Sequence, residues 1–182
     1  MASPGFNGMF VATTDDPRVE EFTHGERETL LSYLRNYRIT LELKCADLTP
    51  AQLAHRSVPP SDLSLLGLVR HMGRVEQHWF RRVMEHRLDL PRLRATEDGS
   101  DLSFTEAVGT AACVEDAFAV WKSEIAYADD YLAGVESFDV LGQTNAGPVE
   151  LRDVLVHMIE EYARHCGHAD LLRECVDGRT GQ

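Results

Sequence analysis

Apolar side chains recur at three- and four-residue intervals in four long stretches of this 182-residue chain. This period gathers them on one face of a helix, where they can be buried together. The helices predicted in this way span about residues 25–48, 63–87, 103–132 and 148–177. Strand signals are weak, and we find no internal repeat or low-complexity tract. Four amphipathic helices with connections of medium length predict an all-α protein, specifically a four-helix bundle.

The chain divides into a lead-in, one domain and a short tail. Residues 1–24 are punctuated by glycine and proline and show no helical period, which predicts an extended segment. Residues 25–178 are long enough for a single domain with its own hydrophobic core. Gly178 is expected to end the last helix, and residues 179–182 are expected to be loose.

Capping residues set the expected starts of the second and third helices. Ser61 or Asp62 is a suitable N-cap for the second helix. Ser103 and Glu106, three residues apart, predict a capping box for the third. The fourth helix is expected to follow a loop-like crossover at residues 134–147.

A stripe of metal-binding residue types follows one face of the last predicted helix. Its members are His157, Glu161, His165 and His168. Their spacings of four, four and three residues confine them to an arc of roughly 80°. A glutamate and a histidine four residues apart on a helix can both reach one ion, as Glu161 and His165 would. With His71 of the second helix as third ligand, one position would stay open, which is typical of catalytic zinc.

Other interpretations of these polar residues remain. Any single histidine can be an ordinary hydrogen-bonded side chain on a helix. For His157, His168 and His78, lining of a pocket or plain hydrogen bonding is favoured over metal ligation. Glu76 and Arg74 are interpreted as solvated charges on the second helix.

Composition narrows the classes of partner. The formal net charge is −12, which argues against nucleic acids and anionic membrane surfaces, since both attract clustered lysine and arginine. The chain has no apolar run long enough to span a bilayer and no signal-peptide pattern. The four cysteines form no CxxC pair, so we expect free thiols and a cytoplasmic protein.

Two stretches, LSLLGLVRHMGRVEQHWF and VLVHMIEEYARHCGHADLLRE, resemble the signature helices of the DinB-like superfamily. They are most similar to its mycothiol-dependent, maleylpyruvate-isomerase-like branch. The resemblance covers about residues 26–177 and implies a four-helix bundle with a divalent metal in its core. It implies His71, Glu161 and His165 as ligands, with glutamate where other members carry the first histidine of an HxxxH pair. The further C-terminal domain of the isomerases is not expected, so a stand-alone thiol S-transferase is the nearer analogue.

The predicted function is therefore metal-dependent thiol transfer. A divalent cation lowers the pKa of a bound thiol, and the thiolate is the nucleophile. A small thiol similar to mycothiol would be activated at the open position and would attack a small electrophile. His168 or His78 could act as general base, since imidazole titrates near neutral pH. Arg38 is either a group that holds the thiol substrate or a surface arginine.

Two other functions stay open at this point. The same three ligands with a bound water would make a metal-dependent hydrolase. A fourth ligand, such as His168, would make a non-catalytic metal-binding protein of the stress-response or interaction type. Zinc suits one carboxylate and two imidazoles, but nickel, iron or manganese would also bind. The family resemblance further implies a homodimer.

Overall fold

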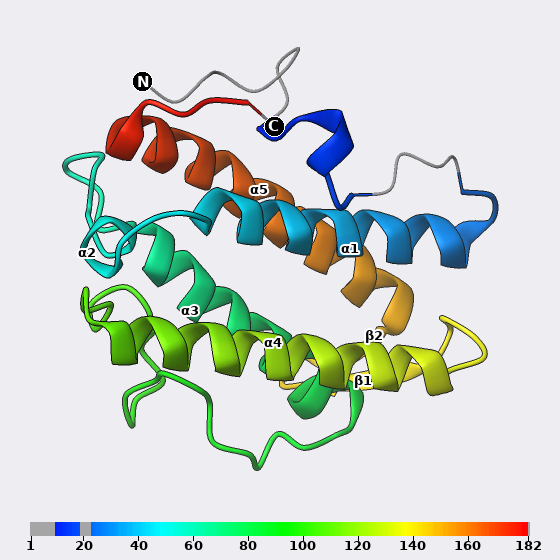
Figure 1. Ribbon diagram of the computed structural model, residues 1–182. Helices are drawn as coiled ribbons and strands as arrows, with labels where there is room; N and C mark the ends of the chain where they lie inside the picture. Colours follow the sequence, from blue (N-terminus) through cyan, green and yellow to red (C-terminus); the bar gives the residue numbers. More distant parts are fainter. Residues whose placement is uncertain (1–9, 19–22, 182) are drawn as a thin grey trace.

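Four long helical segments run side by side through the protein (Figure 1). The computed structural model describes residues 10–18 and 23–181. The long segments are α1 (Glu26–Cys45), α3 (Leu65–Glu76) with its π-helical continuation η3 (Gln77–Met84), α4 (Ala111–Gly134) and α5 (Leu151–Asp177). Shorter elements are the 3-10 helix η2 (Thr13–Asp15), α2 (Pro50–Leu53) and the strands β1 (Leu141–Thr144) and β2 (Gly147–Glu150). Helices dominate the described chain, so the predicted all-α class is confirmed.

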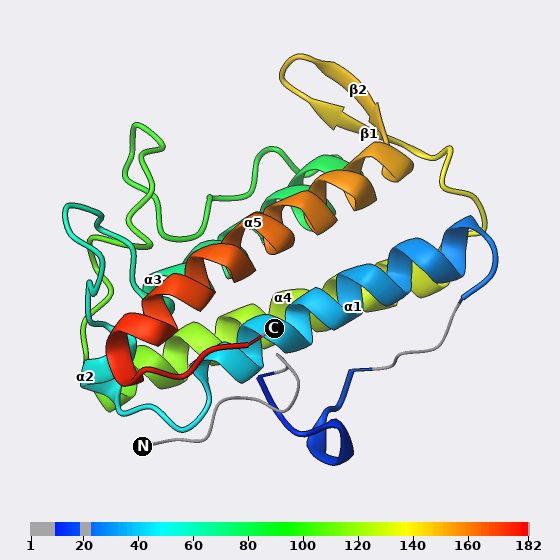
Figure 2. The ribbon, with the colours of Figure 1, turned by 90° about the horizontal axis from the view of Figure 1, so that it is seen from above.

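The long helices pack in two layers. Helix α1 packs along α5, and α3 packs along α4. Seen from above, α5 runs over α3 while α1 runs over α4 (Figure 2). Each helix therefore turns its apolar stripe toward the same interior, which is how amphipathic helices remove apolar surface from water. Within the described residues, no helix is long and apolar enough to cross a membrane.

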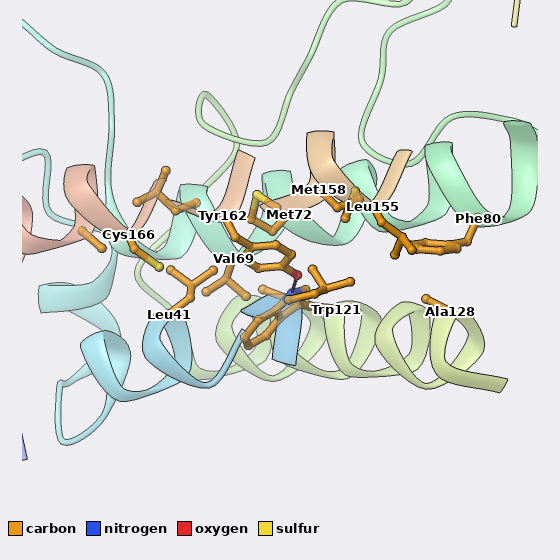
Figure 3. Close-up of a cluster of buried hydrophobic side chains, with 14 of the residues drawn as sticks. Leu41, Val69, Met72, Phe80, Trp121, Ala128, Leu155, Met158, Tyr162 and Cys166 are labelled. Atoms are coloured by element: carbon orange, nitrogen blue, oxygen red, sulfur yellow. Dashed lines mark hydrogen bonds between the residues drawn. The ribbon is translucent and has the colours of Figure 1, made fainter. Parts of the chain in front are cut away.

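The interior is a continuous cluster of apolar side chains from all four long segments (Figure 3). Helix α1 contributes Leu41, α3 contributes Met72, and α4 contributes Trp121, all at most 1% exposed. Helix α5 contributes Leu155 and Met158, which are fully buried. Burying a side chain of this size stabilises the folded state by about 1.5–3 kcal/mol, so this cluster is the main source of stability.

Three predicted helix starts are wrong, and hydrogen bonds show why. The third helix begins at Ala111 rather than near Ser103, because the Thr110 hydroxyl accepts a hydrogen bond from the amide of Cys113 at 3.3 Å. The predicted capping box does not form, and the buried Ser103 hydroxyl has no hydrogen-bond partner in the described structure. Ser64, not Ser61 or Asp62, caps α3. The fourth helix begins three residues late, at Leu151, because residues 147–150 form a strand.

An antiparallel hairpin occupies much of the crossover that was predicted to be loop. Leu141 pairs with Glu150, and Thr144 pairs with Gly147. Gly142 allows the hairpin to lie close against η3, because a Cβ there would meet the Met84 sulfur at 2.7 Å. With only four residues in each strand, the hairpin carries too little pattern for its sequence to reveal it.

A buried polar network joins the four long helices. Arg38 of α1 forms two hydrogen bonds of 2.8 Å with the carboxylate of Glu76 on α3, which is fully buried. The Tyr162 hydroxyl of α5 donates to the same carboxylate at 2.7 Å. Trp121 of α4 donates to the Tyr162 hydroxyl at 2.8 Å (Figure 3). Glu76 is therefore not a solvated charge, and Arg38, which also binds Asp129 at 2.8 Å, is not a surface arginine.

This network predicts that Glu76→Gln is strongly destabilising. The substitution removes the buried charge that faces Arg38 and leaves only the largely exposed Asp129 as its ionic partner. The free energy of unfolding should therefore fall by about 3–5 kcal/mol. Urea denaturation followed by circular dichroism measures this change. Glu115→Gln, at an exposed position of α4, is the control and should change stability by less than about 0.5 kcal/mol. Equal stability of the two variants would contradict the role assigned to Glu76.

Candidate metal centre

Helices α3 and α5 bring His71, Glu161 and His165 together. One ligand atom from each of the three side chains lies within 4.8 Å of the others. Glu161 Oε2 is 3.4 Å from His165 Nε2 and 4.0 Å from His71 Nε2. Glu161 and His165 are one helical turn apart, so the helix itself aligns them. His71 reaches them only because α3 packs beneath α5.

A carboxylate behind His71 sets the direction of its ring. His71 Nδ1 lies 2.8 Å from Asp101 Oδ2, so Nδ1–H donates there and Nε2 is left to face Glu161. Asp101 also receives hydrogen bonds from Arg74 at 3.1 Å and the Ser103 amide at 2.8 Å. Burial would raise the pKa of Asp101, but the hydrogen bonds from His71 and Ser103 and the Arg74 charge hold it well below its usual range. Arg74 is thus an ion-pair partner rather than a solvated charge.

His165 is held in the neutral form that binds metals. Burial, followed by the nearby His71 and His168 rings, lowers the pKa of His165 to about 4. Its Nδ1 lies 3.3 Å from His168 Nδ1, which leaves Nε2 facing Glu161. Both imidazoles of the cluster therefore turn their Nε2 atoms to one carboxylate, and each has a partner at Nδ1. Such partners fix the ring orientation of metal-binding histidines.

The donor set fits a divalent ion. Bonds of about 2.0–2.1 Å in a tetrahedral zinc site place neighbouring ligand atoms about 3.3 Å apart. The 3.4 Å separation of Glu161 from His165 matches this spacing, and His71 needs only a small approach from 4.0 Å. One carboxylate and two imidazoles are ligands found in three-ligand catalytic sites, where one position remains for water or substrate.

A cavity of about 240 Å³ adjoins the cluster. His71 and Glu161 form part of its wall, and Val75 and Trp79 add apolar surface. It is large enough for a small molecule beside the three ligands. The π-helix η3 carries Trp79 and His78 into this wall, and π-helical turns occur frequently at functional sites.

The remaining candidate residues have different surroundings. His157 lines the cavity, packs its ring 4.9 Å from that of Trp79 and lies 3.8 Å from Glu161. His78 also lines the cavity, but burial and neighbouring arginines lower its pKa to about 4, so the argument that it titrates near neutrality does not hold. His168 contacts His165 and is absent from the cavity wall. Arg38 is not in the wall either, because its guanidinium binds Glu76 and Asp129.

Sequence reasoning missed Asp101. It lies 30 residues after His71, on a loop between η3 and α4, and no local spacing connects the two. Its carboxylate reaches the site because the loop is anchored, with the Leu93 amide donating to Gln77 Oε1 at 3.0 Å. The only sequence signal is an acidic residue in a polar segment, which is too common to indicate a site.

The fold and the cluster define a helix-dominated protein with a His–Glu–His group suited to a divalent metal. The family model described as mycothiol S-transferase matches residues 29–178. The chain therefore belongs to the mycothiol S-transferase family, a DinB-like family.

A solved structure supports the fold. It is titled as a conserved protein of locus from Enterococcus faecalis and superposes with a TM-score of 0.59 at 20% identity. The match covers 86% of this chain and all of the other, so the two share a fold. No curated protein matches the chain by sequence.

The geometry predicts that His71, Glu161 and His165 each contribute to metal affinity. Replacing any one of them with alanine removes a direct ligand. Loss of a residue that only orients a ligand lowers metal affinity by about 10–100-fold, so zinc affinity should fall by more than this in each alanine variant. Competition with a chromogenic chelator measures the affinity, and elemental analysis gives the content. His157→Ala is the matched control, since His157 shares the helix face and the cavity. Full metal content in all three alanine variants would show that the ligand set is wrong.

Asp101→Asn should weaken metal binding without removing a ligand. The amide keeps a similar shape but loses the charge that orients His71, so affinity should fall by about 10–100-fold. The same chelator titration tests this. Asp98→Asn, an exposed change on the same loop, should leave affinity unchanged. Identical affinities for Asp101→Asn and the unmodified protein would contradict the orienting role.

Proposed function

We propose that this protein is a metal-dependent thiol S-transferase, which joins a low-molecular-weight thiol of the mycothiol kind to a small electrophile. Membership of the mycothiol S-transferase family supports the thiol. The observation that carries the metal dependence is the convergence of two imidazole Nε2 atoms on one Glu161 oxygen beside a cavity. We also propose that residues 25–178 form a single four-helix bundle domain with this site in its interior.

His71, Glu161 and His165 would hold the ion, and zinc suits their chemistry best. When bound, a divalent ion lowers the pKa of a thiol at the open position and so supplies thiolate at neutral pH. His71, Glu161 and His165 would determine the net charge around the ion and the direction in which its open position faces. Their Nδ1 partners, Asp101 and His168, keep the two rings from rotating away.

The cavity would place the electrophile against the thiol. Val75 and the face of Trp79 offer apolar contact to a carbon skeleton, and they limit access of water to that side. His78 stays neutral at ordinary pH because burial and the arginines near it lower its pKa to about 4, so it can hydrogen-bond to substrate without adding charge. The reaction forms one sulfur–carbon bond as the thiol loses its proton. In a substitution the bond from that carbon to its leaving group breaks and the proton goes to solvent, whereas in an addition the π bond of the electrophile breaks and the neighbouring carbon takes up a proton. Holding both reactants in one cavity removes most of the entropic barrier to their encounter.

A conjugation assay tests this function. Purified protein with mycothiol and monobromobimane should give fluorescent conjugate faster than the uncatalysed reaction. Chelation of the metal, or Glu161→Gln, should lower the rate at least about 100-fold, because a metal ion contributes several kcal/mol to such a step. Added zinc should restore the chelated protein but not the variant.

The controls separate the proposal from its alternatives. His157→Ala reports on cavity shape with the ligands intact, and cysteine in place of mycothiol reports on thiol choice. A rate unaffected by metal removal would refute the proposal. Consumption of ester or amide substrates without any thiol would assign the same three ligands to a hydrolase instead.

A further inference from the structure

Three arginines gather at one side of the candidate site; we call Arg74, Arg82 and Arg92 the arginine cluster. Arg74 and Arg92 line the cavity beside His71 and Glu161. Arg92 also lines a neighbouring cavity of about 530 Å³, together with Arg82. Arg92 therefore stands at the boundary between the two cavities. The proximity of the charges also affects Arg82: burial lowers its pKa most, Arg92 lowers it further, Asp89 opposes this, and Arg74 has the smallest lowering effect.

Arg82 is a largely buried arginine without a hydrogen-bond or ion-pair partner in the described structure, and Nε is the nitrogen of its guanidinium that is closed off from solvent. Only 7% of the residue is exposed, and its Nε is inaccessible to solvent and forms no hydrogen bond. The other comparably buried arginines of the described chain are all satisfied by carboxylates or carbonyls: Arg38, Arg70 and Arg173. A buried charge without a partner destabilises the folded protein. An arginine that has no partner in the free protein is therefore suited to binding an anionic ligand.

The charge around the cluster is not balanced by its neighbours. Asp101 neutralises Arg74, but no ion pair of Arg82 or Arg92 occurs among the described residues. Asp89, which acts on Arg82 from a distance, binds Arg87. Glu97 and Asp98 line the second cavity but are exposed, and Asp98 binds Ser100. The protein as a whole has a net charge of −12, but these two unpaired positive charges make the electrostatic potential around Arg82 and Arg92 locally positive.

We propose that Arg82 and Arg92 form a subsite for a carboxylate of the electrophilic substrate, next to the position of the reacting sulfur. The planar guanidinium groups match a carboxylate in shape and charge. A single negative charge is favoured over a phosphate dianion, because Glu161 and Asp101 lie nearby and repel a second charge. Mycothiol carries no carboxylate or phosphate, so the subsite serves the electrophile rather than the thiol.

The subsite assigns the acceptor to a class, small anionic electrophiles, and this assignment rests on the proposed transferase function. The carboxylate would orient the acceptor so that its reactive carbon lies in the cavity between Trp79 and the metal ligands. The binding itself needs neither metal nor thiol. It can therefore be measured separately from conjugation.

Equilibrium binding of two matched probes tests the subsite. The probes are 3-succinimidopropionate, which is an unreactive carboxylate, and its primary amide, titrated by NMR or calorimetry into zinc-loaded and metal-free protein. The acid should bind at least about tenfold tighter than the amide, the effect of one or two charge-assisted hydrogen bonds. This preference should persist in metal-free protein, where the acid cannot bind an ion.

Single substitutions test whether the preference for the acid depends on Arg82 and Arg92. Arg92→Gln changes an exposed side chain and should abolish the preference for the acid while leaving amide binding unchanged. Arg82→Gln should do the same, and its thermal denaturation shows whether it remains folded; if it does not fold, Arg92→Gln decides. Arg35→Gln is the matched control, because Arg35 is exposed on α1 and lines a different cavity.

Equal binding of acid and amide by the unmodified protein would overturn the subsite. So would a preference that survives in Arg92→Gln or is lost equally in Arg35→Gln. A second readout is the conjugation of 3-maleimidopropionate and its amide, where the arginine variants should raise KM about tenfold for the acid alone. If the protein prefers the acid through its arginines but forms no conjugate, the transferase function is refuted and the subsite stands. If it forms conjugate but binds acid and amide equally, the subsite is refuted and the transferase function stands.

Discussion

The candidate site depends on the buried ion pair between Arg38 and Glu76. Glu76 lies five residues after His71 on α3, and its partner Tyr162 directly follows Glu161 on α5. The hydrogen bond between Tyr162 and Glu76 therefore fixes the separation of α3 and α5 beside the ligands. Burying a carboxylate is favourable only when its oxygens are fully paired, as Arg38 and Tyr162 pair them here. The pairing that permits a charge in the core therefore also sets the positions of the three side chains of the candidate metal centre.

Around this fixed pair of helices, the site is completed by one loop. The segment after η3 returns Asp101 to His71 and places Arg92 in the cavity wall. Gln77, the first residue of η3, holds the loop by accepting a hydrogen bond from Leu93. The loop and the π-helix therefore add two features that α3 and α5 alone do not provide: the Asp101 carboxylate behind His71 and a basic residue, Arg92, in the cavity wall.

The two proposed parts of the site have complementary chemistry. The His–Glu–His cluster is suited to an ion that activates sulfur, in accord with the family of this chain. The arginine cluster is suited to an anion, although the chain as a whole is strongly acidic. Nearby acidic groups limit the charge that such a substrate can carry, whereas Val75 and Trp79 favour a carbon skeleton between the two parts.

The sequence determined whatever depends on local spacing. The helical period predicted the all-α class, and the four-residue step placed Glu161 and His165 on one face of α5. His71 of the second predicted helix was the expected third ligand, the family resemblance implied the same residue, and the structure brings the three together. Only the tertiary structure decided that Glu76 and Arg38 are buried partners, that Asp101 reaches His71, and that Arg82 lies buried and unpaired. Such contacts join residues far apart in the sequence, and Arg38 and Glu76 are 38 positions apart. Helical periodicity cannot show which of the many charged side chains meet, because the packing of the helices determines it.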